Sequence, residues 1–351
     1  MCLALALIPW QPLLATDHAS ILIYHHVSES TPESTSVTPE VFARHMDYLA
    51  ANGFTVWPLG KTLDTLQSGN ALPEKTVSIT FDDAYQSVRD HAAPVLKRHG
   101  WPYTIFVSTR AIDEGYHNYL SWNDLAELVR EGAEIGNHSY THAHLIRRLN
   151  DENDQQWRNR VEGDIRRAQQ EIQTTLGVES RLFSYPYGEY TSDLQELVGA
   201  LGYFGITQQS GAIGPGFDTL AVPRFPMATQ FADMERLVIA ANARPLPIRK
   251  VETGARILKE GVTSKQHYSF DIRPDGYRLS GLACYSNDGA RIDMDRTPNT
   301  DGIHISMALP DWPTGVRKVN CTAPSSTEKD VYYWYAQLWI VQYANGSWKE
   351  E

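Results

Sequence analysis

Residues 20–241 alternate between short apolar runs and stretches with helical periodicity, and this alternation constrains the fold more than any other feature. The apolar runs are rich in β-branched and aromatic residues, as buried strands are. Strands that alternate with helices form a parallel sheet. Roughly seven βα units are present, about the number that closes a TIM-like barrel. The sequence therefore predicts an α/β fold with a distorted (β/α)7 barrel, and an open doubly wound sheet is the alternative.

The apolar run 77–81 ends in two adjacent carboxylates, Asp82 and Asp83. Folds of the α/β class place their chemistry at the C-terminal tips of their strands. Because successive side chains of a strand point to opposite sides, one acid could bind a metal while the other handles a proton. Paired acids after a strand also form turns or helix N-caps, so the motif needs support from elsewhere in the chain.

Three histidines follow the strand predicted at residues 133–136, namely His138, His142 and His144. Two imidazoles four residues apart can face one ion if the segment is helical. Imidazole and carboxylate together are a usual ligand set for zinc and related metals. With Asp83, two of the histidines would leave open positions on the ion for water and substrate.

A third cluster runs from Arg181 to Gly188, where a predicted strand enters a Pro-Tyr-Gly turn. Together with residues 80–83 and 138–142, it resembles the first three motifs of the polysaccharide deacetylase family, the NodB-homology carbohydrate esterases (carbohydrate esterase family 4). Order, spacing and placement at strand ends all agree, and the resemblance covers roughly residues 20–240. It implies a distorted (β/α) barrel that removes N- or O-acetyl groups from sugars with the help of a divalent metal.

The resemblance also implies a role for each matching residue. The metal ligands would be Asp83, His138 and His142. The metal is expected to be zinc, with cobalt or nickel as alternatives. Asp82 would be the base that takes a proton from water, and Arg181 resembles the arginine that orients this base. The backbone N–H of Tyr187 would help to hold the oxyanion.

The chain departs from the common family pattern because residues 189–260 contain no histidine that could serve as the general acid. His25, at the end of the first predicted strand, is our candidate for that role. This arrangement resembles the circularly permuted branch that contains the periplasmic poly-β-1,6-N-acetylglucosamine deacetylases, in which the acid precedes the aspartate pair. His26 stands where that branch usually has Asp. A buried structural histidine at a strand end is the alternative reading of His25.

The pattern divides the chain into three parts. Residues 1–15 resemble the apolar region and cleavage site of a signal peptide, although they lack a basic segment. Residues 16–250 form the predicted catalytic domain. Residues 251–351 consist of short alternating segments separated by turn signals, which predicts a small β-sandwich.

Two features of the predicted sandwich bear on its stability and its role. Cys284 and Cys321 both lie in it and are a plausible disulfide in an exported protein. Residues 331–341 are densely aromatic. These aromatics would either form the core of the sandwich or contact carbohydrate by stacking on sugar rings.

A net charge of −11 argues against nucleic acid or anionic membrane as the main partner, because no Lys/Arg block balances it. The leader is too short to span a bilayer, so we expect no transmembrane span and a periplasmic or secreted protein. The resemblance implies a metal-dependent hydrolase that removes N-acetyl groups from polysaccharide or oligosaccharide containing N-acetylglucosamine. An O-acetyl xylan esterase of the same fold and a non-catalytic carbohydrate-binding protein are the alternatives.

Overall fold

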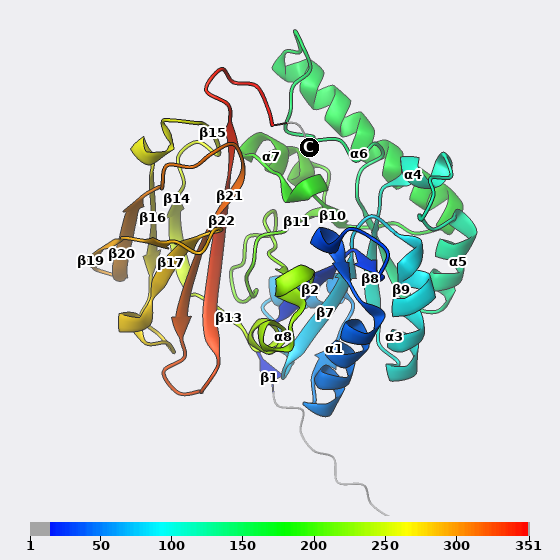
Figure 1. Cartoon of the computed structure of the whole chain (residues 1–351), viewed down its shortest axis with the longest axis horizontal. Coiled ribbons are helices and arrows are strands. Elements are labelled where there is room, and N and C mark those ends of the chain that lie inside the picture. The colour runs from blue at the N-terminus through cyan, green and yellow to red at the C-terminus, as the bar shows by residue number, and fades with distance from the viewer. Residues whose placement is uncertain (1–14, 350–351) are drawn as a thin grey trace, which may run out of the picture.

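The central feature of the structure is a curled parallel β-sheet. The computed structural model describes residues 15–349 and is shown in Figure 1. The strands of the sheet lie in the order β11-β10-β9-β8-β7-β2-β12, and β5 pairs in parallel with the beginning of β7. The strands are β2 (Ser20–Tyr24), β5 (Thr55–Val56), β7 (Thr76–Phe81), β8 (Tyr103–Val107), β9 (Ala133–Asn137), β10 (Leu182–Ser184), β11 (Phe204–Ile206) and β12 (Phe225–Pro226).

The order of these strands distinguishes between the two predicted topologies. From β2 through β7 to β11, neighbours in the sheet follow chain order, whereas a doubly wound sheet reverses its order at a switch point. On its other side β2 pairs with β12, and a bridge between Ile206 and Val222 draws the two ends of the sheet toward each other. The predicted α/β fold is confirmed. The predicted (β/α)7 barrel takes the form of a curled half-barrel.

Helices connect successive strands and pack against the sheet (Figure 1). They are α1 (Pro39–Ala51), α2 (Leu59–Gln67), α3 (Ala93–His99), α4 (Thr109–Asp113), α5 (Trp122–Arg130), α6 (Asp154–Leu176), α7 (Ser192–Ala200) and α8 (Met234–Ala241). Short two-residue strands pair outside the main sheet: β1 (Ala15–Thr16) with β6 (Leu72–Pro73), and β3 (His26–Val27) with β4 (Ser36–Val37).

The longest helix, α6, shows how local sequence sets an element. A capping box between Asn153 and Gln156 begins it, and Gly177 ends it in the left-handed conformation that glycine adopts without strain. Its buried residues recur three or four positions apart and form one stripe. They are Trp157, Val161, Ile165, Ala168 and Ile172. The remaining polar face lies in solvent, and the buried stripe fixes the helix beside β9.

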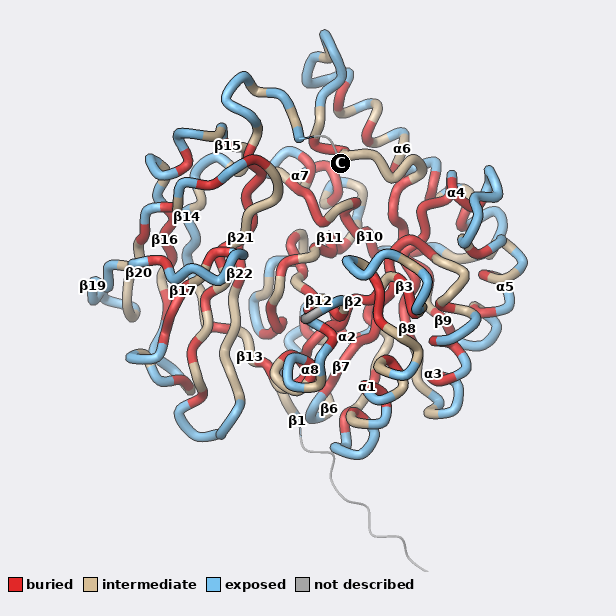
Figure 2. The backbone as a smooth tube through the Cα atoms, in the orientation of Figure 1, coloured by how far each residue is buried: buried red, intermediate tan, exposed pale blue. Residues whose placement is uncertain are grey.

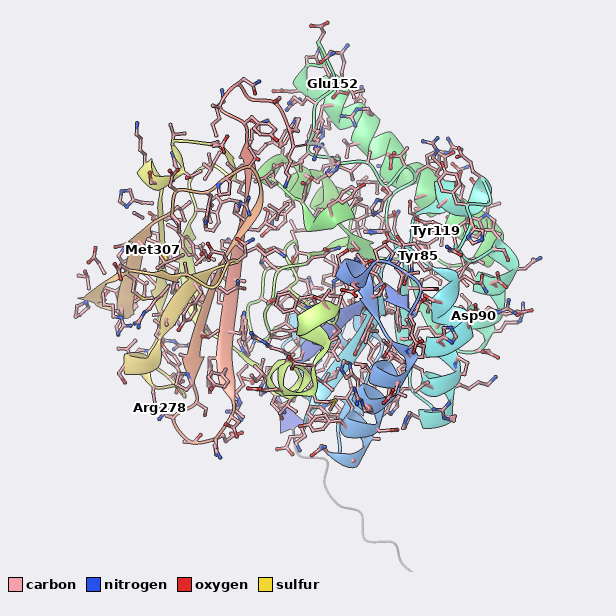
Figure 3. The ribbon with its side chains drawn as sticks, viewed as in Figure 1. Tyr85, Asp90, Tyr119, Glu152, Arg278 and Met307 are labelled. Atoms are coloured by element: carbon pink, nitrogen blue, oxygen red, sulfur yellow. A yellow bond between two sulfur atoms is a disulfide. The ribbon has the colours of Figure 1, made fainter. Side chains whose placement is uncertain are left out.

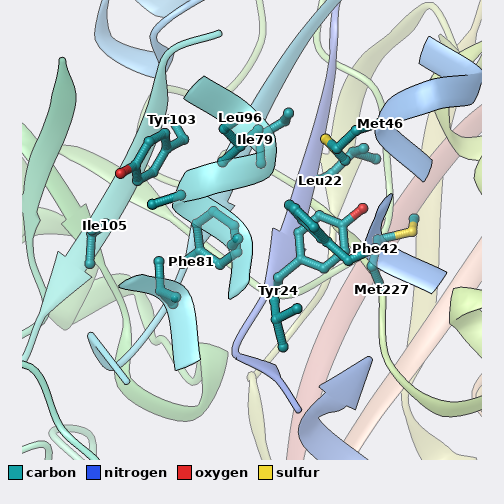
Figure 4. Close-up of a cluster of buried hydrophobic side chains, with 14 of the residues drawn as sticks. Leu22, Tyr24, Phe42, Met46, Ile79, Phe81, Leu96, Tyr103, Ile105 and Met227 are labelled. Carbon is teal, nitrogen blue, oxygen red and sulfur yellow. The ribbon is translucent and has the colours of Figure 1, made fainter. Parts of the chain in front are cut away.

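The core of the half-barrel lies between the sheet and the helices that cover it. Strands β2, β7 and β8 are buried along their whole length (Figure 2). Figure 4 shows aromatic rings at the centre of this core, among them Tyr24, Phe42 and Phe81. Each large apolar side chain buried in this way contributes about 1.5–3 kcal/mol to folding. This packing holds the C-terminal ends of the strands, where the polar motifs lie, in a fixed frame.

The C-terminal part of the chain forms two sheets that enclose a second hydrophobic cluster. One has the strand order β14-β16-β20-β19, and the other has the order β13-β22-β21-β17-β18 with β15 also paired to β22. Their bounds are β13 (Arg244–Pro245), β14 (Ile248–Glu252), β15 (Ile257–Lys259), β16 (His267–Ile272), β17 (Ala283–Ser286), β18 (Arg291–Ile292), β19 (Asp295–Asn299), β20 (Gly302–Ala308), β21 (Gly315–Pro324) and β22 (Tyr332–Gln342). Cys284 and Cys321 face each other across β17 and β21 and form a disulfide.

Strand β22 packs against both halves of the molecule. Trp339 and Val341 belong to the cluster between the two C-terminal sheets. Leu338 and Ile340 point the other way and pack with Phe183 and other residues of the half-barrel. Residues 336–341 of the strand are therefore buried on both faces, and the C-terminal sheets share a core with the half-barrel.

Most of the predicted signal peptide, residues 1–14, lies outside the described residues. Within residues 15–349, no helix combines the length and apolar character that a membrane crossing requires.

Candidate metal centre and active site

A buried ion pair stands at the C-terminal end of β7. Asp82 and Arg224 are both fully buried and face each other. The Arg224 Nη atoms donate to the two carboxylate oxygens of Asp82 at 2.6 and 2.7 Å. Burial is the largest single influence and raises the pKa of Asp82, but the charge and hydrogen bonds of Arg224, together with His138 and His25, outweigh it and lower this pKa to about 2. The carboxylate is therefore held ionised, the form in which it can act as a base.

Arg224 is itself fixed by groups from several elements. Its Nε donates to the Thr207 carbonyl oxygen at 2.9 Å, and Nη1 donates to Thr80 Oγ1 at 3.1 Å. Nη2 donates to Ser184 Oγ at 2.9 Å, and that hydroxyl donates to Asp82 at 3.2 Å. A guanidinium with this many partners has one orientation available, so the geometry of the base is set before any substrate arrives.

The prediction that Arg181 orients Asp82 is wrong. Arg181 precedes β10 and thus lies at the N-terminal end of a strand whose C-terminal end faces the site. Its Nη1 pairs with Asp64 of α2 at 3.1 Å, and both side chains are more than half exposed. Arg224 occupies the position that was predicted for Arg181.

The three predicted metal ligands lie together. Nε2 of His138 is 3.3 Å, and Nε2 of His142 is 3.1 Å, from the same Oδ1 atom of Asp83. The three ligand atoms all lie within 4.8 Å of one another. The side chains come from the C-terminal ends of β7 and β9, which flank β8 in the parallel sheet, and this explains why residues more than fifty positions apart in sequence converge.

His138 has the environment of a metal ligand. Its Nδ1 is 2.7 Å from the carbonyl oxygen of Ser184, which can only accept, so Nδ1 carries the proton of the neutral ring. In this neutral form, which a metal requires, Nε2 turns a lone pair toward Asp83 Oδ1, 3.3 Å away. This nitrogen is buried and makes no hydrogen bond to any described residue. Two acceptors that face each other in a buried site are stabilised by a cation between them, so these residues fit a divalent metal.

The loop that carries the histidines is not helical, contrary to the geometry first considered for residues 138–142. Ser139 and His142 have positive φ values of 67° and 53°, and Asp83 and Tyr187 have values of 71° and 59°. A non-glycine residue in this region costs on the order of 1–2 kcal/mol. Such strain persists where the surroundings enforce it, as at functional sites.

Helix α6 holds this loop in place through Asp164. Its carboxylate accepts from the backbone N–H of Tyr140 at 2.8 Å and from Thr141 Oγ1 at 2.6 Å. Within the loop, Ser139 Oγ accepts from the backbone N–H of His142 at 3.0 Å. These bonds explain how His142 keeps its strained conformation and points at Asp83.

His25 follows β2 and lies close enough to the carboxylates to feel their charge. Burial lowers the pKa of His25, and the negative charges of Asp83 and Asp82 oppose this shift without cancelling it. The ring is therefore neutral near pH 7. A neutral His25 has to take up a proton before it can act as an acid.

His26 is a packing residue next to the site. Its ring stacks on Tyr85 at 3.6 Å between centroids, and Tyr85 lies against Tyr119 at 4.8 Å (Figure 3). Burial lowers the pKa of His26 to about 4, which keeps the ring neutral. The residue that replaces the branch's usual aspartate thus adds no charge here at neutral pH.

Tyr187 reaches the site from the turn Pro186–Gly188 that follows β10. Its ring stacks on His144 at 3.9 Å and meets the edge of His142 at 4.7 Å. Nδ1 of His144 pairs with Glu189 at 2.7 Å. The third histidine of the cluster therefore supports Tyr187 and lies outside the ligand group.

Comparison with known proteins identifies the part of the chain that carries these groups. Residues 69–206 match the family model for polysaccharide deacetylases. The chain carries a NodB-type polysaccharide deacetylase domain. The matched region extends from before β7 to the end of β11. It thus contains the Asp82–Asp83 pair and both histidine ligands, whereas His25 and Arg224 lie outside it.

Relatives of this deacetylase domain occur in several bacteria. The Bacillus subtilis protein YxkH is 30% identical over 194 residues, which cover 55% of this chain and 65% of YxkH, just under two thirds of its length. The poly-β-1,6-N-acetyl-D-glucosamine N-deacetylase of Staphylococcus epidermidis is 26% identical over 230 residues, covering 59% of this chain and 78% of that protein.

Solved structures show the same fold as the deacetylase domain. IcaB from Ammonifex degensii has a TM-score of 0.55 and 27% identity, covering 62% of this chain and 94% of IcaB. The Streptococcus pyogenes deacetylase PplD has a TM-score of 0.58 at 20% identity, covering 64% of this chain and 98% of PplD. The half-barrel is therefore the fold of known deacetylases.

Sequence reasoning missed two residues of the candidate site, Arg224 and Gln208. Gln208 Nε2 donates to Asp82 Oδ2 at 3.4 Å from the loop after β11. The signal for Arg224 was a lone arginine within the apolar segment 221–226, since a charge in such a segment needs a buried partner. Gln208 carries no comparable signal.

Proposed function

We propose that this protein is a metal-dependent N-deacetylase of polysaccharide or oligosaccharide that contains N-acetylglucosamine. The observation that carries the proposal is the pairing of two adjacent carboxylates with different partners. Asp82 is held ionised by Arg224, while Asp83 faces two imidazole nitrogens. A base beside a metal site is what hydrolysis of an amide with one water requires.

Each side chain has a defined task in this proposal. A divalent cation held by Asp83, His138 and His142 would polarise the acetyl carbonyl and lower the pKa of water. Asp82 takes a proton from the attacking water, and its carboxylate is oriented for this by the Arg224 guanidinium. The backbone N–H of Tyr187, a residue in the left-handed conformation, would help to hold the developing oxyanion.

The C–N bond breaks as acetate forms, and the leaving amine needs a proton. His25 is our candidate donor because it follows β2 and lies close enough to both carboxylates to feel their charge. Since burial keeps the free ring neutral, His25 must gain its proton as the reaction proceeds, and the proton that Asp82 takes from water supplies it, passing through His25 to the leaving amine. The products are acetate and a free amine on the sugar, so the glycan gains positive charge.

The class of substrate is supported by the relatives. The Staphylococcus epidermidis relative is named for poly-β-1,6-N-acetyl-D-glucosamine, and its match covers 78% of that protein. We therefore favour an N-acetylglucosamine polymer over acetylated xylan. Zinc is the metal we expect from the ligand set, and cobalt or nickel would also suit two nitrogens and one oxygen.

We further propose that the protein works outside the cytoplasm and that residues 251–351 form a β-sandwich accessory domain. The disulfide between Cys284 and Cys321 supports an oxidising compartment. The two C-terminal sheets that share one hydrophobic cluster support the sandwich. Whether this part contacts carbohydrate can be tested by glycan binding to Asp82→Asn, which should bind without turnover.

Acetate release is the experiment that tests the proposal. Metal-loaded protein should free acetate from oligomers of β-1,6-linked N-acetylglucosamine, with chitin oligomers, peptidoglycan and acetylated xylan as the comparison panel. Asp82→Asn should abolish release while the metal still binds, because the ligands are unchanged. Acetate from xylan alone would favour the esterase, and tight glycan binding without any acetate would favour a non-catalytic protein.

A further inference from the structure

A lysine from the C-terminal sheets reaches the loop that supports the base. Lys318 lies on β21, and its Nζ donates to the carbonyl oxygen of Gln208 at 2.8 Å. The side chain of the same Gln208 donates to Asp82 at 3.4 Å. Gln208 thus connects strand β21, which lies far outside the family match of residues 69–206, to the carboxylate of Asp82 at the centre of the proposed site.

Lys318 points toward the half-barrel because of its place on the strand. Val316, two residues earlier on the same face, packs against the half-barrel cluster, and Leu338, the cross-strand partner of Lys318, belongs to that cluster. Arg317 points the other way. It donates to the carbonyl oxygens of Pro313 and Thr314, which lie just before β21. Burial lowers the pKa of Lys318 to about 8, as expected for an ammonium enclosed by protein.

The loop that Lys318 holds contacts the site at several points. The carbonyl oxygens of Thr207 and Gln209 accept from Arg224, through its Nε and its backbone N–H, each at 2.9 Å. Gln208 also packs against the turn that presents Tyr187. A Cβ added to Gly188 would lie 2.7 Å from Gln208 Cβ, so the two backbones are in close approach. A shift of residues 207–209 would therefore move the ion pair and the turn together.

We propose that Lys318 is a positioning residue for deacetylation, through which the C-terminal sheets fix the loop 207–209 and hence the Asp82–Arg224 pair. This inference rests on the proposed function. Without the ammonium, the partly buried carbonyl of Gln208 loses its donor, and the loop relaxes to find another. Because a displacement of about 1 Å at a reacting group can cost about 100-fold in rate, a small relaxation is enough to be measured.

The test compares Lys318→Met and Lys318→Arg with the matched control Arg317→Met, which removes a long cationic side chain from the opposite face of the same strand. We expect Lys318→Met to lower kcat roughly 10-fold to 100-fold with KM changed less than twofold, since positioning of the base acts on the chemical step. Lys318→Arg should recover most of the rate, and Arg317→Met should keep it. Equal kcat in Lys318→Met and wild type would overturn the inference.

A double-mutant cycle with Gln208→Met separates positioning from loss of fold. If Lys318 acts through Gln208, the two substitutions together should lower kcat by less than the product of their separate effects. Independent, multiplying effects would overturn the inference, as would a fall in kcat that merely follows the unfolded fraction measured by thermal denaturation. A wild-type protein that frees no acetate overturns the proposed function and this inference with it. An active wild type with an unaffected Lys318→Met overturns this inference alone.

Discussion

The buried pair of Asp82 and Arg224 allows a prediction whose size can be worked from the structure. Arg224→Met removes the guanidinium but keeps a long apolar side chain, which leaves a fully buried carboxylate without its counter-charge. Removing one partner of a buried ion pair costs about 3–5 kcal/mol. Since a domain is stable by about 5–15 kcal/mol in total, this loss should lower the urea midpoint markedly.

The surface pair of Arg181 and Asp64 supplies the matched control. Both of these side chains are more than half exposed, so Arg181→Met should cost no more than about 1 kcal/mol. Removing both partners in Asp82→Asn/Arg224→Met should recover part of the loss, because no uncompensated charge is then buried. Acetate release should be lost in Arg224→Met and retained in Arg181→Met.

Urea denaturation, monitored by fluorescence, and the acetate assay together test whether Arg224 holds Asp82. A loss below about 1 kcal/mol in Arg224→Met would show that Asp82 is not held as described. Loss of activity in Arg181→Met with activity kept in Arg224→Met would restore the role first predicted for Arg181.

Three further predictions concern other parts of the molecule. His25→Ala should lower kcat by about 100-fold to 10,000-fold while metal binding is unchanged, and wild-type rates in this variant would refute the acid assignment. Cys284→Ser opens a link between residues 37 positions apart and should cost about 3–4 kcal/mol of unfolding free energy; an unchanged urea midpoint would contradict this. Burial lowers the pKa of His45 to about 4, against its hydrogen bond to a backbone carbonyl, so the unfolded chain takes up this proton near pH 6.5 and the folded protein only near pH 4. Stability should thus fall as the pH drops through that window, by up to roughly 3 kcal/mol, and His45→Gln should lack this component; identical pH profiles for the two proteins would count against it.

The ligand group could be predicted from the sequence because all its members lie within five residues of the C-terminal end of a strand. The strands of a parallel sheet bring their C-terminal ends to the same edge, so Asp83 after β7 and the two histidines after β9 lie on one edge, on either side of β8. The same rule argues against a role for Arg181 in orienting Asp82. A residue that precedes a strand lies at the opposite end of the sheet from one that follows it.

Arg224 could not be predicted in the same way because its partner is 142 positions away. The pairing of Arg224 with Asp82 depends on how far the sheet curls and on which segment returns to pair with β2. The local sequence pattern contains neither piece of information. The conformation of residues 138–142 was also beyond the sequence. The positive φ values of Ser139 and His142 are imposed by hydrogen bonds to Asp164 of a later helix and to the Ser139 hydroxyl. Serine does not usually adopt positive φ values.

Only part of the role of the aromatic strand β22 could be predicted from the sequence. Its dense run of aromatic residues predicted either the core of the sandwich or stacking on sugar rings, and the structure buries residues 336–341 on both faces, one in each hydrophobic cluster. A strand that is apolar on both sides looks the same in sequence whether its second face meets protein or a ligand. The contact with the half-barrel, which Lys318 extends to the site, therefore required the structure.

Convergence of Asp83, His138 and His142 on one cation is the claim on which the whole account depends. Calorimetric titration of chelator-treated protein with Zn²⁺ tests it most directly. We predict one equivalent bound by the wild type, and an affinity weaker by at least 100-fold in His138→Ala and in Asp83→Ala, with His144→Ala close to wild type because His144 supports Tyr187 and not the metal. Equal Zn²⁺ binding by the wild type and His138→Ala, or no binding by the wild type, would contradict the account.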